Sequence, residues 1–166
     1  MRKYFSLISL STLCLCLAVS PVLAKKNPAK MVRKAIDLYR HQGRPLLADG
    51  MILGALELYK ERNNQRGIAN AYSNYGEFLR SESVEEHIGY YTKNGFWDKS
   101  VTYETRLYKA NEYFKLAIDQ YKIAEIESQE NNQYDILTNI YFNLAWLNYR
   151  VDDLQKACDY YETIRT

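Results

Sequence analysis

The stretch "NIYFNLAWLNYRVDDLQKACDYY", residues 139–161, decides the fold. Its first half, together with Leu137 two residues before it, carries apolar side chains in steps of three and four: Leu137, Ile140, Leu144 and Leu147. That spacing predicts an amphipathic helix. Asp152 is a suitable N-cap for a second helix, in which Ala157 and Tyr161 lie four residues apart. The stretch therefore predicts two helices joined by a short turn.

The same pattern occurs earlier in the chain. Asn70-x-Tyr72-x-Asn74-x-Gly76 recurs as Asn139-x-Tyr141-x-Asn143-x-Ala145, at a constant offset of 69 residues. An apolar stripe over 68–79 and a longer one over about 99–130 also show helical spacing, the longer one at Tyr103, Leu107, Ala110, Phe114, Ala117, Tyr121 and Ala124. Outside residues 89–100 no stretch alternates as a strand does. The chain is therefore predicted to be all-α, with repeated helical pairs that stack.

This pattern resembles the tetratricopeptide repeat. In that family a first helix carries large residues beside a Leu and a small residue, and a second helix carries Ala-x-x-x-aromatic. The last repeat matches with Tyr141, Leu144, Ala145, Ala157 and Tyr161, the middle one with Tyr72, Tyr75, Gly76, Leu79, Ala110 and Phe114, and the first with Met31, Ala35, Leu38, Ala55 and Tyr59. The resemblance covers about residues 28–165. It implies a TPR-like right-handed stack of about three antiparallel helical hairpins.

The spacing of the small residues locates extra sequence in two repeats. Ala145 and Ala157 are twelve apart, as in the family, whereas Gly76 and Ala110 are 34 apart. We therefore expect an insertion at residues 81–102. The first repeat has a smaller surplus, which we place at residues 42–49.

The N-terminus has the features of a secretory signal peptide. A basic start is followed by an apolar run and by small residues up to Ala24, which predicts removal of residues 1–24 and a single domain at 25–166. An uncleaved anchor is the alternative. Without Arg2 and Lys3, Lys+Arg falls from 22 to 20 and equals the 20 Asp+Glu. A neutral chain argues against a nucleic-acid surface, and the protein is expected to be periplasmic or secreted.

Side chains for catalysis are sparse. The two histidines, His41 and His87, lack the spacing of metal ligands, and no glycine-rich phosphate loop occurs. Cys158 is the only cysteine after the signal peptide, and we interpret it as a half-buried structural thiol rather than a nucleophile. We therefore expect a protein that is not an enzyme and uses no metal or cofactor.

The candidate binding site follows from the resemblance, which implies that the first helices of the repeats line a concave groove. The groove-facing positions match Asn70 and Asn74, then Asn139 and Asn143, and in the first repeat Arg33. A carboxamide both donates and accepts hydrogen bonds, so it can hold a peptide backbone, and Arg33 could pair with a carboxylate. The expected function is a non-catalytic scaffold that binds a peptide segment of another protein. The alternative is that these asparagines are solvated or bond neighbouring helices.

The insertion contains "GYYTKNGFWDKS", residues 89–100, which suits a hairpin, a helix end or an aromatic binding loop. We favour a short inserted helix over about 84–93, begun by a capping box at 83–86 and ended by Gly95. Phe96 would then pack on Tyr91. We expect Phe96 and Trp97 to anchor the insertion to the stack.

Two further expectations concern exposed aromatic and apolar side chains. A glycan- or peptidoglycan-associated accessory protein is the alternative function, with Tyr90, Tyr91 and Trp97 as its surface, and exposure of Trp97 would favour it. The last helix has an outer stripe with Tyr161 and Ile164. We expect that stripe to stay exposed and to allow a homodimer.

Overall fold

The computed structural model describes residues 26–165, so the predicted signal peptide lies outside the described residues. Those residues form eight helices and no strand, so the chain is all-α as predicted and the hairpin alternative for residues 89–100 is wrong. The helices are α1 (Pro28–Arg40), α2 (Pro45–Glu61), α3 (Gln65–Leu79), α4 (Glu82–Glu86), α5 (Ile88–Asn94), α6 (Arg106–Glu130), α7 (Tyr134–Arg150) and α8 (Leu154–Arg165). None of these helices is long and apolar enough to cross a membrane.

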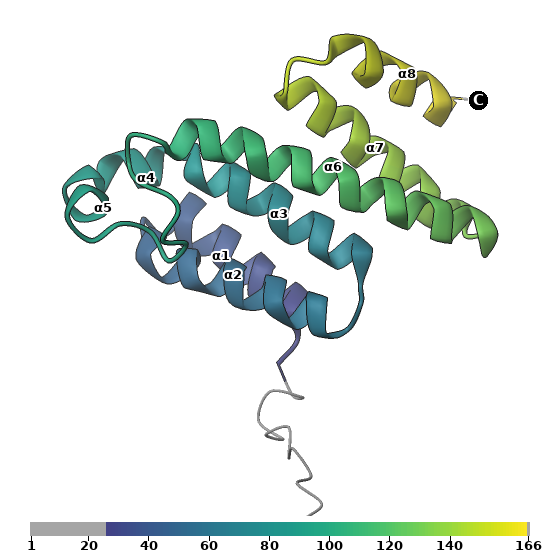
Figure 1. Ribbon diagram of the computed structural model, residues 1–166. Coiled ribbons are helices and arrows are strands. Elements are labelled where there is room, and N and C mark those ends of the chain that lie inside the picture. The colour runs from purple at the N-terminus through teal and green to yellow at the C-terminus, as the bar shows by residue number, and fades with distance from the viewer. Residues whose placement is uncertain (1–25, 166) are drawn as a thin grey trace, which may run out of the picture.

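The six long helices pack mainly on their neighbours in the chain. The extensive contacts are α1 with α2, α2 with α3, α3 with α6, α6 with α7, and α7 with α8, while α1 also touches α3. Figure 1 shows the result: α1, α2 and α3 lie at one end, α7 and α8 at the other, and the long α6 runs between them. The short α4 and α5 project from the end of the molecule where α3 leads into α6.

Small buried residues bring the helices close together. Alanines at the positions that the repeat pattern reserves for small residues are nearly or completely inaccessible: Ala35, Ala55, Ala110, Ala145 and Ala157. At the remaining position, a Cβ on Gly76 would lie 2.5 Å from the Phe114 ring and 3.0 Å from the Ala110 carbonyl oxygen. The packing of α3 on α6 at this position therefore requires glycine, which has no Cβ. On α7, the predicted core stripe of Leu137, Ile140, Leu144 and Leu147 is buried.

The turns before α8 and α2 refine two of the predictions. Asp152 has a φ of +63°, and the side chain of Asp153, not Asp152, accepts the capping hydrogen bond from the main-chain N–H of Lys156. Residues 42–49, where we placed the surplus of the first repeat, form the turn after α1 and the start of α2, since Pro45 is already in the first turn of that helix. Proline suits the first turn because it lacks the N–H that would be unpaired there.

The insertion differs from its prediction at its start but not at its end. Two short helices, separated at His87, replace the single helix expected over 84–93. Ser83 lies inside α4 and its hydroxyl makes no capping bond, so the predicted capping box is wrong. Gly95 has a φ of +69° and ends α5, and the Phe96 ring stacks on Tyr91 at 4.2 Å between centroids, which confirms that contact.

The long helix α6 begins at Arg106 rather than near residue 99. The main-chain N–H of Ser100 donates to the Asp98 side chain, and Thr102 and Thr105 bond each other's main-chain N–H through their hydroxyls. Such bonds compete with helix formation for the same backbone groups. Leu107, in the first turn of α6, is 46% exposed and is therefore not a core residue.

Candidate functional site

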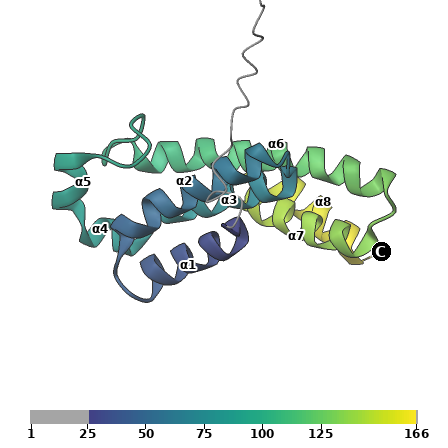
Figure 2. The same ribbon diagram turned by 90° about the horizontal axis from the view of Figure 1, so that it is seen from below.

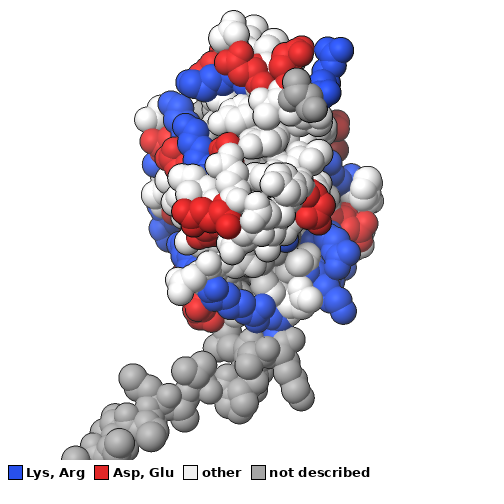
Figure 3. Space-filling view, turned by 90° about the vertical axis from the view of Figure 1, so that its right-hand side faces the viewer, with Lys and Arg blue, Asp and Glu red and all other residues white. Residues whose placement is uncertain are grey.

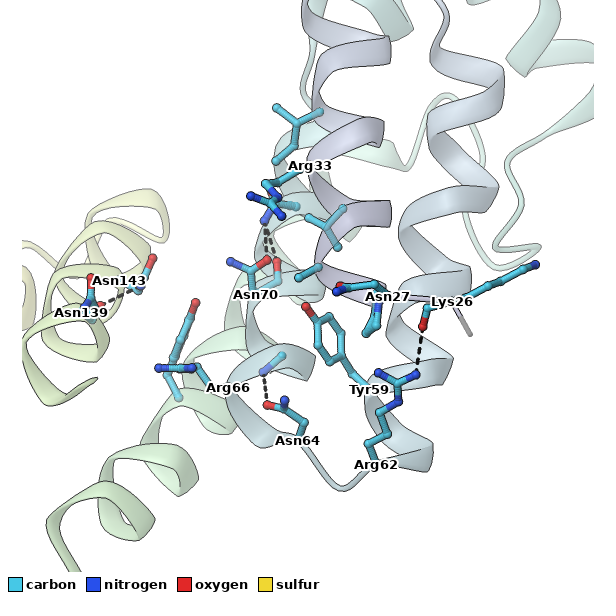
Figure 4. Close-up of a pocket in the computed structure, with 17 residues that line it drawn as sticks. Lys26, Asn27, Arg33, Tyr59, Arg62, Asn64, Arg66, Asn70, Asn139 and Asn143 are labelled. Atoms are coloured by element: carbon cyan, nitrogen blue, oxygen red, sulfur yellow. Dashed lines mark hydrogen bonds between the residues drawn. The ribbon is translucent and has the colours of Figure 1, made fainter. Parts of the chain in front are cut away.

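The five predicted groove residues line one cavity. Helices α1 and α7 lie on the same side of α6, with α3 between them (Figure 2). The cavity that these helices border has a volume of about 1040 Å³, and its lining includes Arg33, Asn70, Asn74, Asn139 and Asn143. We call this cavity the groove. Figure 4 shows Asn139 and Asn143 on α7, across the groove from Asn70 on α3 and Arg33 on α1.

The asparagines have the same local geometry in both repeats. Asn74 Nδ2 donates to the Asn70 main-chain carbonyl at 2.8 Å, and Asn143 Nδ2 donates to that of Asn139 at 2.7 Å. Asn139 in turn donates to the carbonyl of Asp135 at 3.0 Å. These bonds go to each asparagine's own helix and hold the carboxamides at the groove surface, while the Asn70 side chain also forms a hydrogen bond with Tyr121 on α6.

The groove lining is basic. Lys26, Arg33, Arg62 and Arg66 line it, and no Asp or Glu does. Arg62 is fixed by a 2.9 Å hydrogen bond from its guanidinium to the Lys26 carbonyl (Figure 4). On the face shown in Figure 3, by contrast, charges of both signs are interspersed. The positive charge of the groove lining favours an anionic ligand there.

Two tyrosines complete the groove. Burial raises the pKa of Tyr121 to about 12 and also raises the pKa of Tyr59, so both hydroxyls are neutral near pH 7. The Tyr59 ring lies directly against α3, since a Cβ on Gly67 would be 2.1 Å from Tyr59 Cδ1. Gly67 thus allows a large aromatic side chain to fill the end of the groove between α2 and α3.

Sequence analysis missed several lining residues. Arg66 precedes Asn70 and Asn74 at steps of four on α3, so helical spacing alone could have identified it. Lys26 and Arg62 lie just outside α1 and α2, where no periodicity applies. The residue 69 positions after Arg66 is Asp135, which does not line the groove.

The alternative aromatic surface is not formed as predicted. Tyr91 is only 1% exposed, because it packs between Phe78 and Phe96 in the core. Tyr90 and Trp97 are exposed, and Trp97 lines a cavity apart from the groove; the exposure of Trp97 is the outcome that favours the alternative. The insertion is anchored by Phe96, 1% exposed, whereas the Trp97 side chain is 68% exposed rather than an anchor.

The remaining chemically reactive side chains do not form a site. Cys158 is exposed rather than half-buried, because Ala157 is the one residue of α8 that is fully buried. His87 Nδ1 lies 2.9 Å from the Ser83 carbonyl oxygen. Among residues 26–165, no cluster of His, Cys, Asp and Glu could hold a metal ion.

No family model, curated protein or solved structure matches this chain. The groove and its chemistry are therefore the basis on which a function can be inferred.

Proposed function

We propose that this protein is a non-catalytic, tetratricopeptide-like scaffold that binds an extended acidic peptide segment of another protein in the groove. One observation carries the proposal. Five side chains on three separate helices, Arg33, Asn70, Asn74, Asn139 and Asn143, border a single cavity in which all four charged lining residues are basic. The tetratricopeptide resemblance assigns these same five positions to a groove, and this agreement supports the proposal.

The lining suggests how such a segment would be held. Carboxamides can bond the main chain of an extended peptide whatever its sequence, each for about 0.5–1.5 kcal/mol net. The guanidinium groups of Arg33 and Arg66 can each bind a carboxylate with two parallel hydrogen bonds. Apolar residues on α1, Val32 and Ile36, border the same cavity and can accept an apolar side chain of the peptide. The sum suits modest, reversible binding.

We further propose that the protein works outside the cytoplasm, after removal of residues 1–24, and that it forms a homodimer through α8. The first proposal rests on the sequence of the N-terminus. The second rests on exposed apolar side chains along α8, with Leu154 58% and Tyr161 41% exposed.

The function is tested by selecting twelve-residue peptides from a displayed random library against the protein. Selected peptides should be rich in Asp and Glu, and their affinity should fall with added salt. Replacing Asn74 and Asn143 together with Ala should weaken binding roughly 5- to 150-fold, as the loss of two such hydrogen bonds implies. Fluorescence anisotropy with a labelled peptide measures the change.

The matched control is Asn111→Ala, an exposed asparagine of α6 outside the groove, which should leave binding unchanged. A charge reversal, Arg66→Glu, should abolish binding of acidic peptides. Enrichment of neutral or basic peptides, or full binding by the folded double variant, would contradict the proposed function.

A further inference from the structure

A second cavity lies on a different face of the molecule from the groove. It has a volume of about 490 Å³ and is bordered by α2, α3, α6 and residues 97–100. Helix α3 contributes Tyr72 to it, and Tyr72 is two residues from both Asn70 and Asn74. Side chains two residues apart on a helix point about 200° away from each other. Tyr72 and the two asparagines therefore lie on opposite faces of α3, and each face lines a different cavity.

Trp97 is the most exposed aromatic residue of this second cavity, and it is held in place. Its main-chain N–H donates to Asp49 Oδ2 at 3.0 Å, and the preceding Phe96 is buried in the core. The indole lies over Gly50, where a Cβ would come within 3.1–3.4 Å of three ring carbons. One part of the ring therefore rests on α2. Trp97 as a whole is 68% exposed, so the rest of its ring offers a fixed apolar surface.

The polar groups beside Trp97 are paired donors and acceptors. Lys109 pairs with Glu112 at 2.8 Å, and Lys60 pairs with Glu57 at 2.9 Å. Asp98 accepts hydrogen bonds from Ser100 and from the Tyr113 hydroxyl. The lining thus presents charges of both signs.

This mixture of positive and negative side chains favours a neutral ligand over a cation or an anion. A cation would meet two lysines, one of which already lies 5.9 Å over the Tyr72 ring. An anion would meet the carboxylates of Glu57, Asp98 and Glu112. A neutral molecule with many hydroxyl groups can donate to the carboxylates and accept from the ammonium groups. Its apolar C–H face can cover the exposed indole.

We propose that this second cavity binds a short neutral oligosaccharide, with one pyranose ring stacked on Trp97 and its hydroxyls bonded to Asp98 and to the Lys109–Glu112 pair. The volume of about 490 Å³ lies within the usual range for small-molecule sites. The site shares no lining residue with the groove, so it stands apart from peptide binding.

The test titrates the protein with cellotriose, maltotriose and the trimer of N-acetylglucosamine. At least one should shift the NMR resonance of the Trp97 indole N–H in a saturable way, the resonance being assigned by its loss in Trp97→Phe. Trp97→Ala should weaken binding roughly tenfold or more, as expected for loss of an aromatic platform. Gly50→Ala should also weaken it, because the added Cβ displaces the indole while the fold is kept.

Two controls separate the site from general effects. Trp146→Ala removes the other tryptophan, on α7, and Gly89→Ala adds a Cβ in open space. Both variants should bind as the wild type does. The proposal is overturned if none of the three sugars shifts the Trp97 resonance at up to about 20 mM, well above a millimolar Kd. It is equally overturned if Trp97→Ala binds as tightly as the wild type.

Discussion

Asp49 and Trp97 are joined by a 3.0 Å hydrogen bond from the main-chain N–H of Trp97 to Oδ2 of Asp49, across 48 residues of sequence. The other carboxylate oxygen of Asp49 accepts from the Tyr75 hydroxyl at 3.0 Å. Asp49 is only 4% exposed. One buried carboxylate on α2 therefore connects α3 and the insertion, and it positions the tryptophan of the second cavity.

This carboxylate should make stability depend on pH. Burial raises the pKa of Asp49 to about 6, from 3.8. Between these values the folded protein binds a proton that the unfolded chain has lost, so the free energy of unfolding falls as pH rises through about 4 to 6. Asp49→Asn cannot ionise, so its stability should rise relative to the wild type over this window, by about 3 kcal/mol.

Urea denaturation of both proteins at pH 3.5, 5 and 7 measures this difference. Asp119→Asn, at an exposed aspartate of α6, is the control for replacing a surface carboxylate with a carboxamide. A constant difference between wild type and Asp49→Asn from pH 3.5 to 7 would show that the buried carboxylate does not titrate as its environment implies.

The part of the fold that could be predicted from sequence is the part set by local periodicity. Helical spacing located the long helices, and the 69-residue offset identified Asn70 and Asn139 as equivalent positions. The structure adds that Asn63 and Asn132, also 69 apart, both adopt positive φ in the turns before α3 and α7. The repeat therefore extends to the turns, because a small polar side chain tolerates that conformation.

The part that could not be predicted depends on contacts between distant residues. The start of α6 was placed too early because the bonds among Asp98, Ser100 and the Thr102–Thr105 pair replace a helical turn. Tyr91 is buried because it packs with Phe78 and Phe96, whereas Trp97 lies over Gly50 and stays exposed. Hydrophobicity alone does not distinguish Tyr91 from Trp97, since both are large aromatics in one short stretch.

The close approach of α3 to its neighbours predicts a sensitivity to added methyl groups. Gly67→Ala would place a Cβ 2.1 Å from Tyr59, and Gly76→Ala would place one 2.5 Å from Phe114. Each should lower the free energy of unfolding by about 1–3 kcal/mol, as overpacking does. Gly89→Ala, in open space on α5, should be neutral or slightly stabilising. Equal stability of all three variants in thermal melts would contradict the tight packing.

The exposed side of α8 predicts self-association. Helix α8 buries only Ala157 fully, while Leu154 and Tyr161 are exposed beside the exposed Phe142 of α7. Sedimentation velocity should show a dimer whose proportion grows with concentration, and Leu154→Glu with Tyr161→Glu should shift it to monomer. A monomer at every concentration up to about 1 mM, where weak dimers of a few kcal/mol still form, would exclude this interface.

The orientation of α7 across the groove is predicted to depend on Glu77 and Arg150. Their side chains are largely buried, with Arg150 Nε 2.8 Å from Glu77 Oε1 and a second contact of 3.3 Å to the other oxygen. This ion pair joins α3 to α7, the two helices that carry the groove asparagines, although neither residue lines the groove. A double-mutant cycle with alanine at both positions should give a coupling of about 1–2 kcal/mol in urea denaturation.

Because the pair bridges α3 and α7, Glu77→Ala should also weaken peptide binding several-fold without touching the groove. The matched control is the Glu162–Arg165 pair on α8, in which both side chains are more than 70% exposed. It should show no measurable coupling, since water screens exposed charges. A coupling for Glu77 and Arg150 that is no larger than this control, together with unchanged peptide affinity, would mean that packing of α6 alone positions α7.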